Sequence, residues 1–160
     1  MELHNTKIDI DKGSREKLIA ILNQRLAEAA DLKSQAKQAH WNVKGPNFIA
    51  LHELFDRVSA ELDTHVDDIA ERVTTLGGVA MGTVRLAARN SSLSEYPHEI
   101  SDGTAHVDAL SSALADFGGK VRKAIDTTDE LGDKDTADLF TNVSRNIDKL
   151  LWFVEAHNQA

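Results

Sequence analysis

The sequence predicts an all-α protein, a four-helix bundle in which a long crossover carrying a short helix joins the second and third helices. Three observations predict this. Apolar residues recur at steps of three and four along four long stretches, a period typical of helices and not of strands. Both prolines, Pro46 and Pro97, lie between these stretches. A connection of about two dozen residues without that period separates the second stretch from the third.

The first two helices are expected over residues 14–42 and 47–76. Ser14 is a candidate N-cap for the first, and Gly77-Gly78 ends the second. The apolar row of the first helix is Leu18, Leu22, Leu26, Ala29, Leu32 and Ala36. That of the second is Phe48, Leu51, Phe55, Val58, Leu62, Val66, Ile69, Val73 and Leu76. The turn between them is short, so the two helices should run antiparallel.

The crossover contains a short helical candidate over residues 83–89. A third helix is expected over 102–127, with Gly118-Gly119 inside it, where a closely approaching neighbour would explain the glycines. A fourth is expected over 135–157, capped by Asp133 or Asp135. Two helices, a long crossing and two more helices give the connectivity of ferritin-like bundles. All 160 residues are expected to form one domain.

Composition narrows the function classes. The chain has no cysteine, which excludes disulfides, iron–sulfur clusters and thiol nucleophiles. We find no apolar run long enough to span a membrane and no signal-peptide pattern, so the cytoplasm is the expected location, with the nucleoid as an alternative. A net charge of −8 favours cations over phosphate backbones as binding partners.

One stripe of the second helix carries the candidate chemistry. It lies beside the apolar face and consists of His52, Asp56, Asp63, Asp67 and Glu71. His52 with Asp56, and Asp67 with Glu71, are pairs spaced i,i+4, at which two side chains of a helix can reach one ion. The two pairs cannot share an ion within one helix, because Asp56 and Asp67 are roughly 16 Å apart along the axis.

A second copy of the chain could complete each half-site. The two pairs are placed symmetrically about a point between residues 61 and 62, so an antiparallel copy of the helix would bring His52 and Asp56 of one chain against Glu71 and Asp67 of the other. His40, near the end of the first helix, is a natural additional ligand. Two imidazoles and three carboxylates suit iron(II), and less selectively manganese or zinc.

Other interpretations of these residues remain. The acids could be a solvated helix face and the histidines packing residues. A di-iron centre inside one bundle would need two Glu-x-x-His pairs, and the single match, Glu95 to His98, contains Pro97. The segment from His52 to Asp56 is similar to a zincin helix, but lacks that helix's second histidine.

Four segments of the chain resemble the Dps family of mini-ferritins. They are KQAHWNVKGPNF at residues 37–48, LHELFD at 51–56, DDIAER at 67–72 and DKLLWFVE at 148–155. The resemblance implies a hollow shell of twelve subunits with its iron sites at the two-fold axes. It also implies that Asp67 and Glu71 of one subunit with His40 of another bind the tighter iron, and that His52 and Asp56 help to bind a second.

The same resemblance implies a reaction. Members of the family oxidise iron(II), preferably with hydrogen peroxide, and store iron(III) oxide in the cavity, which protects against oxidative damage. By this resemblance, Trp41 could intercept stray oxidising equivalents near the iron site. The alternative is that Trp41 is a large apolar packing residue, which is also what we expect of Trp152. Asp133 and Asp138 match the acids that line the family's three-fold pores, although capping and solvation explain them equally well.

The DNA binding of some family members is not expected here. Members of the family that bind DNA strongly often do so through a flexible terminal extension rich in lysine and arginine. The segment before the first helix contains Lys7 and Lys12 against Glu2, Asp9 and Asp11, and the last six residues are not basic. The leading interpretation is therefore a ferroxidase and iron store. The alternatives are a DNA-compacting shell with secondary metal sites and a helical oligomer with neither activity.

Overall fold

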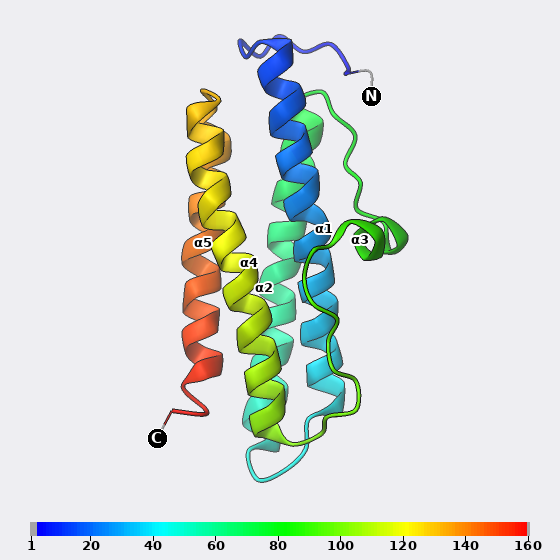
Figure 1. Ribbon diagram of the computed structural model, residues 1–160, viewed down its shortest axis with the longest axis vertical. Coiled ribbons are helices and arrows are strands. Elements are labelled where there is room, and N and C mark those ends of the chain that lie inside the picture. The colour runs from blue at the N-terminus through cyan, green and yellow to red at the C-terminus, as the bar shows by residue number, and fades with distance from the viewer. Residues whose placement is uncertain (1–2, 160) are drawn as a thin grey trace.

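A computed structural model describes residues 3–159 and confirms the all-α fold. Its helices are α1 (Lys12–Asn42), α2 (Phe48–Thr75), α3 (Val84–Asn90), α4 (Gly103–Glu130) and α5 (Lys134–Glu155). Figure 1 shows four long helices side by side, with the crossover descending along the outside of α1 and α3 partway along it. None of these helices is long and apolar enough to cross a membrane.

The structure corrects one expected helix cap and selects between two others. Asp11 rather than Ser14 caps α1, and its Oδ1 accepts a hydrogen bond of 3.0 Å from the Ser14 backbone N–H. Of the two acids offered for α5, Asp133 is the cap, and its carboxylate accepts from the Thr136 N–H. In both cases an aspartate accepts from a backbone N–H that lacks an intrahelical partner.

The predicted apolar rows form the core. All six residues of the first row are buried, and in the second row only Phe48 and Val66 are not. The two glycines within α4 have different surroundings. A Cβ on Gly118 would lie 3.3 Å from Ile147 Cγ2 of α5, whereas one on Gly119 would meet nothing within 4 Å. Close helix packing therefore explains Gly118 and leaves Gly119 unexplained.

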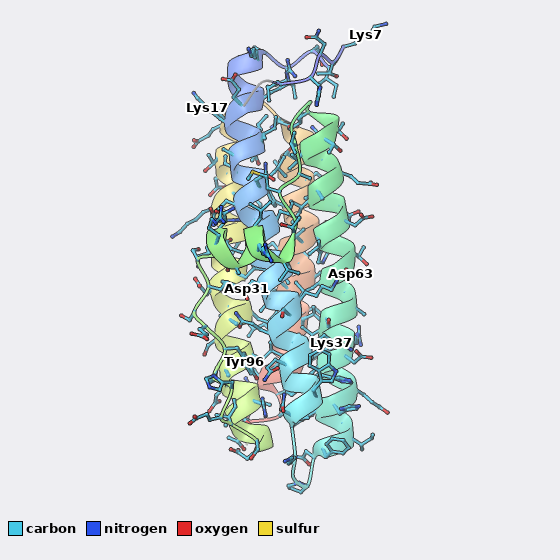
Figure 2. The ribbon with its side chains drawn as sticks, turned by 90° about the vertical axis from the view of Figure 1, so that its right-hand side faces the viewer. Lys7, Lys17, Asp31, Lys37, Asp63 and Tyr96 are labelled. Atoms are coloured by element: carbon cyan, nitrogen blue, oxygen red, sulfur yellow. The ribbon has the colours of Figure 1, made fainter. Side chains whose placement is uncertain are left out.

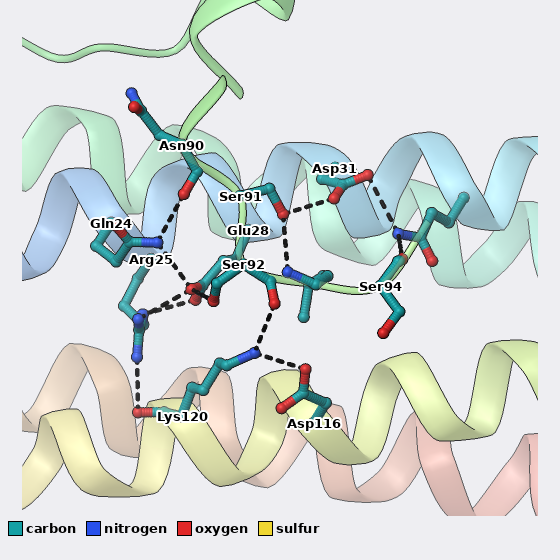
Figure 3. Close-up of polar contacts among 12 residues, drawn as sticks. Gln24, Arg25, Glu28, Asp31, Asn90, Ser91, Ser92, Ser94, Asp116 and Lys120 are labelled. Atoms are coloured by element: carbon teal, nitrogen blue, oxygen red, sulfur yellow. Dashed lines mark hydrogen bonds and ion pairs between the residues drawn. The ribbon is translucent and has the colours of Figure 1, made fainter. Parts of the chain in front are cut away.

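A buried carboxylate holds the crossover against the bundle (Figure 3). Glu28 of α1 is fully buried, and its side chain accepts hydrogen bonds from Gln24, Arg25 and Ser92. The Arg25 Nε lies 2.8 Å from Glu28 Oε2, and its Nη1 donates to the Lys120 carbonyl oxygen of α4 at 3.1 Å. Ser92 belongs to the crossover, so this cluster joins three segments that are far apart in sequence.

A second buried ion pair joins α2 to the start of α5. Arg72 donates to Asp133 Oδ1 at 2.7 Å and to the Thr136 hydroxyl at 2.9 Å, and the Asp133 side chain is only 2% exposed. Burial acts to raise the pKa of Asp133. Hydrogen bonds from Thr136 and Arg72 outweigh it, so the pKa lies below its ordinary value of 3.8.

Asp133→Asn should therefore destabilise the protein in a pH-dependent way. Asparagine is itself a good N-cap, so the substitution mainly removes the charge facing Arg72, and we expect a loss of about 2 kcal/mol at neutral pH. Because the folded pKa is lowered, the stabilisation is present above the unfolded pKa of about 4 and is lost as pH falls through the folded value. Denaturant unfolding of both proteins at neutral and acidic pH measures this. An equal difference at every pH would contradict it.

Candidate metal centre

The candidate ligands of α2 lie on its outward side, next to the buried row. Asp56, Asp67 and Glu71 are exposed and His52 is half-buried. His40 comes from the last turn of α1 and is also half-buried. The fifth acid of the stripe, Asp63, forms an ion pair with Lys33 of α1. Figure 2 shows the face on which Asp63 of α2 and Lys37 of α1 lie.

His40 and His52 stack on each other in the single chain. Their ring centroids are 3.7 Å apart and their planes differ by 20°. His40 Nδ1 lies 2.7 Å from the His52 carbonyl oxygen, and His52 Nδ1 lies 2.8 Å from the His40 carbonyl oxygen. A carbonyl oxygen can only accept, so both Nδ1 atoms carry the proton. In the neutral rings, Nε2 then keeps the lone pair with which histidine binds metals.

Asp56 lies close to these rings and has a cation beside it. The Lys37 ammonium forms an ion pair of 2.5 Å with the Asp56 carboxylate. This hydrogen bond, more than the positive charge that the two histidines can carry, lowers the pKa of Asp56 below its ordinary value. The carboxylate is therefore anionic at neutral pH. Sequence reasoning missed Lys37, because no local spacing relates a lysine of α1 to an aspartate of α2.

Asp67 and Glu71 lie about three and four helical turns beyond Asp56 along α2. Glu71 borders an open surface pocket of about 430 Å³, with Asp68, Arg72 and Asp138 among its other lining residues. Within residues 3–159 of one chain, no three His, Asp or Glu side chains are grouped so that they could hold a metal ion. That a second chain completes a site from these five residues stays a prediction.

The two tryptophans are mostly exposed in the single chain. The exposed fraction is 66% for Trp41 and 60% for Trp152, so neither is a core residue of its own chain. Lys37 Nζ lies 5.9 Å from the centre of a Trp41 ring, which places this indole beside the Lys37–Asp56 pair. The role of Trp41 in oxidation stays a prediction.

The two acids assigned to a pore differ in their surroundings. Asp138 is exposed and borders the pocket beside Glu71. Asp133 is buried, and its carboxylate is engaged by Arg72 and Thr136, as described above. In one chain, Asp133 therefore has the capping role that the sequence offered as the alternative.

The five histidines outside the proposed site lie on the surface or in the core of the chain. His4, His98 and His157 are exposed. His65 is buried, with its Nε2 2.8 Å from Asn146 Oδ1. His106 is buried beside the hydroxyl of Tyr96. No periodicity relates Tyr96 to His106, so only the folded chain reveals this pair.

Known proteins with similar sequences and structures share this fold. A model of the ferritin-like domain family matches residues 19–160. A DNA protection during starvation protein from Agrobacterium fabrum is 48% identical, over 99% of this chain and 98% of the relative. A protein of the same name from Brevibacillus brevis is 34% identical, over 91% and 97%. The structure of DpsA14 from Streptomyces coelicolor superposes with a TM-score of 0.94 at 33% identity, covering 100% of this chain and 96% of that one.

Proposed function

The chain belongs to the ferritin-like domain family and, within it, to the Dps proteins, and from this premise we propose that it oxidises iron(II) at sites shared between two subunits. Iron(II) is the substrate and hydrogen peroxide the preferred oxidant. The product, iron(III) oxide, is stored in a shell of twelve subunits. The physiological result is iron storage and protection against oxidative damage.

The arrangement of His40 and His52 is the observation that carries this proposal. Each ring fixes the other with its Nδ1 proton on a backbone carbonyl, so both Nε2 lone pairs are available for a metal. A solvated acidic face would not need two histidines from different helices in this reciprocal contact. The exposed carboxylates of the α2 stripe supply the oxygen ligands that suit iron.

The chain's own residues have separate tasks in this reaction. Asp67 and Glu71 of one subunit bind the first iron with His40 of the other, while His52 and Asp56 bind the second. Carboxylates stabilise iron(III) more than iron(II), which favours electron loss. Two iron(II) ions give one electron each to hydrogen peroxide, which takes up two protons and leaves as two waters. Because both electrons arrive together, no hydroxyl radical is released.

An anaerobic titration tests the proposal. Iron(II) should bind to the metal-free assembly at two ions per shared site, and a peroxide addition should then produce iron(III) absorbance rapidly. Zinc(II) and manganese(II) use the same donors, so redox-inert zinc(II) should inhibit by competition. Light scattering on the same sample measures the number of subunits. Slow oxidation at the rate of free iron would contradict the proposal.

A DNA-compacting shell is the second candidate, because the relatives are named for DNA protection. The charge of this chain argues against it: the net charge is −8, and near the start of α1 Lys7 and Lys12 are offset by Asp9 and Asp11. We expect no retention of duplex DNA in a gel-shift assay with submicromolar protein at about 150 mM salt. Retention under those conditions would favour the DNA-binding role.

A further inference from the structure

A buried tyrosine and a buried histidine, neither of them a proposed iron ligand, lie together beside the core. Tyr96 of the crossover is the only tyrosine of the chain, and its hydroxyl oxygen lies 2.7 Å from His106 Nδ1 in the first turn of α4. The exposed fraction is 8% for Tyr96 and 1% for His106. The two rings are nearly parallel, with planes 18° apart.

The pair is a phenol held against a base. Burial raises the pKa of Tyr96 and lowers that of His106, so at neutral pH the resting forms are phenol and neutral imidazole. Tyr96 then donates its hydroxyl proton to the lone pair of Nδ1, and the ring proton of His106 is on Nε2. Among residues 3–159, this Nε2 has no hydrogen-bond partner. Nothing in the iron chemistry proposed above uses either group.

We propose that Tyr96 and His106 act together as a one-electron donor that quenches oxidising radicals formed in or near the protein. The oxidant is a tryptophan radical or a hydroxyl radical. Tyr96 loses one electron and its O–H bond breaks, while a new N–H bond forms at His106 Nδ1. The products are a neutral phenoxyl radical and an imidazolium. A tryptophan radical that receives the electron takes a proton from water and becomes indole again.

The surroundings of His106 favour this proton transfer. Removing an electron from phenol alone creates a very strong acid, so a base already in contact makes the oxidation easier. The Asp102 carboxylate and the backbone carbonyls of Asn42 and Ile100 act to stabilise the charged imidazole, although burial dominates its resting pKa. The Phe55 ring lies 6.4 Å from the His106 ring on the core side, away from water.

The position of the pair suits a last electron donor. In the single chain, the side chains of Trp41 and Trp152 are more than half exposed, whereas Tyr96 is enclosed. Tyr96 lies toward the same end of the bundle as Lys37, whose ammonium lies over Trp41 (Figure 2). The electron that reduces the Tyr96 phenoxyl radical back to phenol would come from iron(II). This last step alone rests on the proposed function.

Pulse radiolysis of the iron-free, assembled protein tests the proposal independently of iron oxidation. Azidyl radicals generated in azide solution remove one electron from tryptophan. We expect the tryptophan-radical absorption to decay as a phenoxyl absorption rises. With one tyrosine in the chain, a phenoxyl signal belongs to Tyr96. Tyr96→Phe should abolish the signal and prolong the tryptophan radical. Failure of native protein to form phenoxyl would overturn the proposal.

Two further measurements test the role of His106. In His106→Gln, the amide oxygen still accepts the phenol hydrogen bond but is too weak a base to take the proton. Phenoxyl formation should therefore slow by at least about tenfold. His98→Gln, at an exposed histidine two residues from Tyr96, should leave the rate unchanged. If His106→Gln fails to assemble, native protein in heavy water decides: a slower rate supports coupled proton transfer, and an equal rate contradicts it.

Discussion

Replacing Asp67 by Asn and Glu71 by Gln in the same chain is expected to abolish rapid iron oxidation. The substitutions keep size and polarity but remove two anionic ligands from each proposed site. Changes to groups that only support a metal ligand cost about ten- to a hundredfold, so loss of the ligands themselves should slow the reaction by at least about a hundredfold. Stopped-flow absorbance after peroxide addition to the anaerobic iron(II)-loaded protein measures this rate.

Asp63→Asn is the matched control for this pair. Asp63 lies on the same stripe, but its carboxylate is paired with Lys33 and it is not a proposed ligand. Its substitution should leave the rate near that of the native protein. Equal rates in native protein and in the double variant would refute the site.

A mixing experiment tests whether the site is shared. A second variant, carrying His40→Ala, His52→Ala and Asp56→Asn, should also be inactive. In a dimer of the two variants, one site would combine the intact histidines of the first with the intact Asp67 and Glu71 of the second. Co-expression should therefore restore part of the activity. If the mixed assembly stays inactive while both variants fold, each chain must use its own ligands.

Arg25→Met should cause the largest loss of stability. It would leave the Glu28 carboxylate fully buried without the guanidinium that contacts it at 2.8 and 3.0 Å. Removing one partner of a buried ion pair typically costs about 3–5 kcal/mol, because the remaining charge is uncompensated. For a chain of this length, that corresponds to a fall in the unfolding midpoint of roughly 6–20 °C. Calorimetry at one protein concentration measures the shift.

Arg122→Met provides the matched control. Arg122 and Asp148 also form an ion pair, at 2.6 Å, but both side chains are about half exposed. Water solvates the remaining carboxylate in that case, so the loss should be below about 1 kcal/mol. Similar shifts for the two variants would show that burial of Glu28 has no special energetic role.

The sequence alone determined the helices and the spacing of the candidate ligands. The apolar rows predicted the four long helices, because a helix must bury one side and its period is fixed by backbone geometry. The spacing of His52, Asp56, Asp67 and Glu71 needed nothing beyond that period. The helix ends were less predictable, because several polar residues near each end can serve as caps, and Asp11 rather than Ser14 does so.

Only the tertiary structure decided which side chains from different segments meet. The stacking of His40 on His52, the pairing of Lys37 with Asp56 and the contact of Tyr96 with His106 all depend on how helices and crossover pack. Glu28 shows most clearly why the sequence could not predict these contacts. Its place on α1 resembles any solvated acid of an amphipathic helix, and it is buried only because the crossover lies over it and Arg25 and Ser92 satisfy its oxygens. The spacing of apolar residues along a helix shows which of its faces is apolar, but not which segment, distant in the sequence, packs over its other faces.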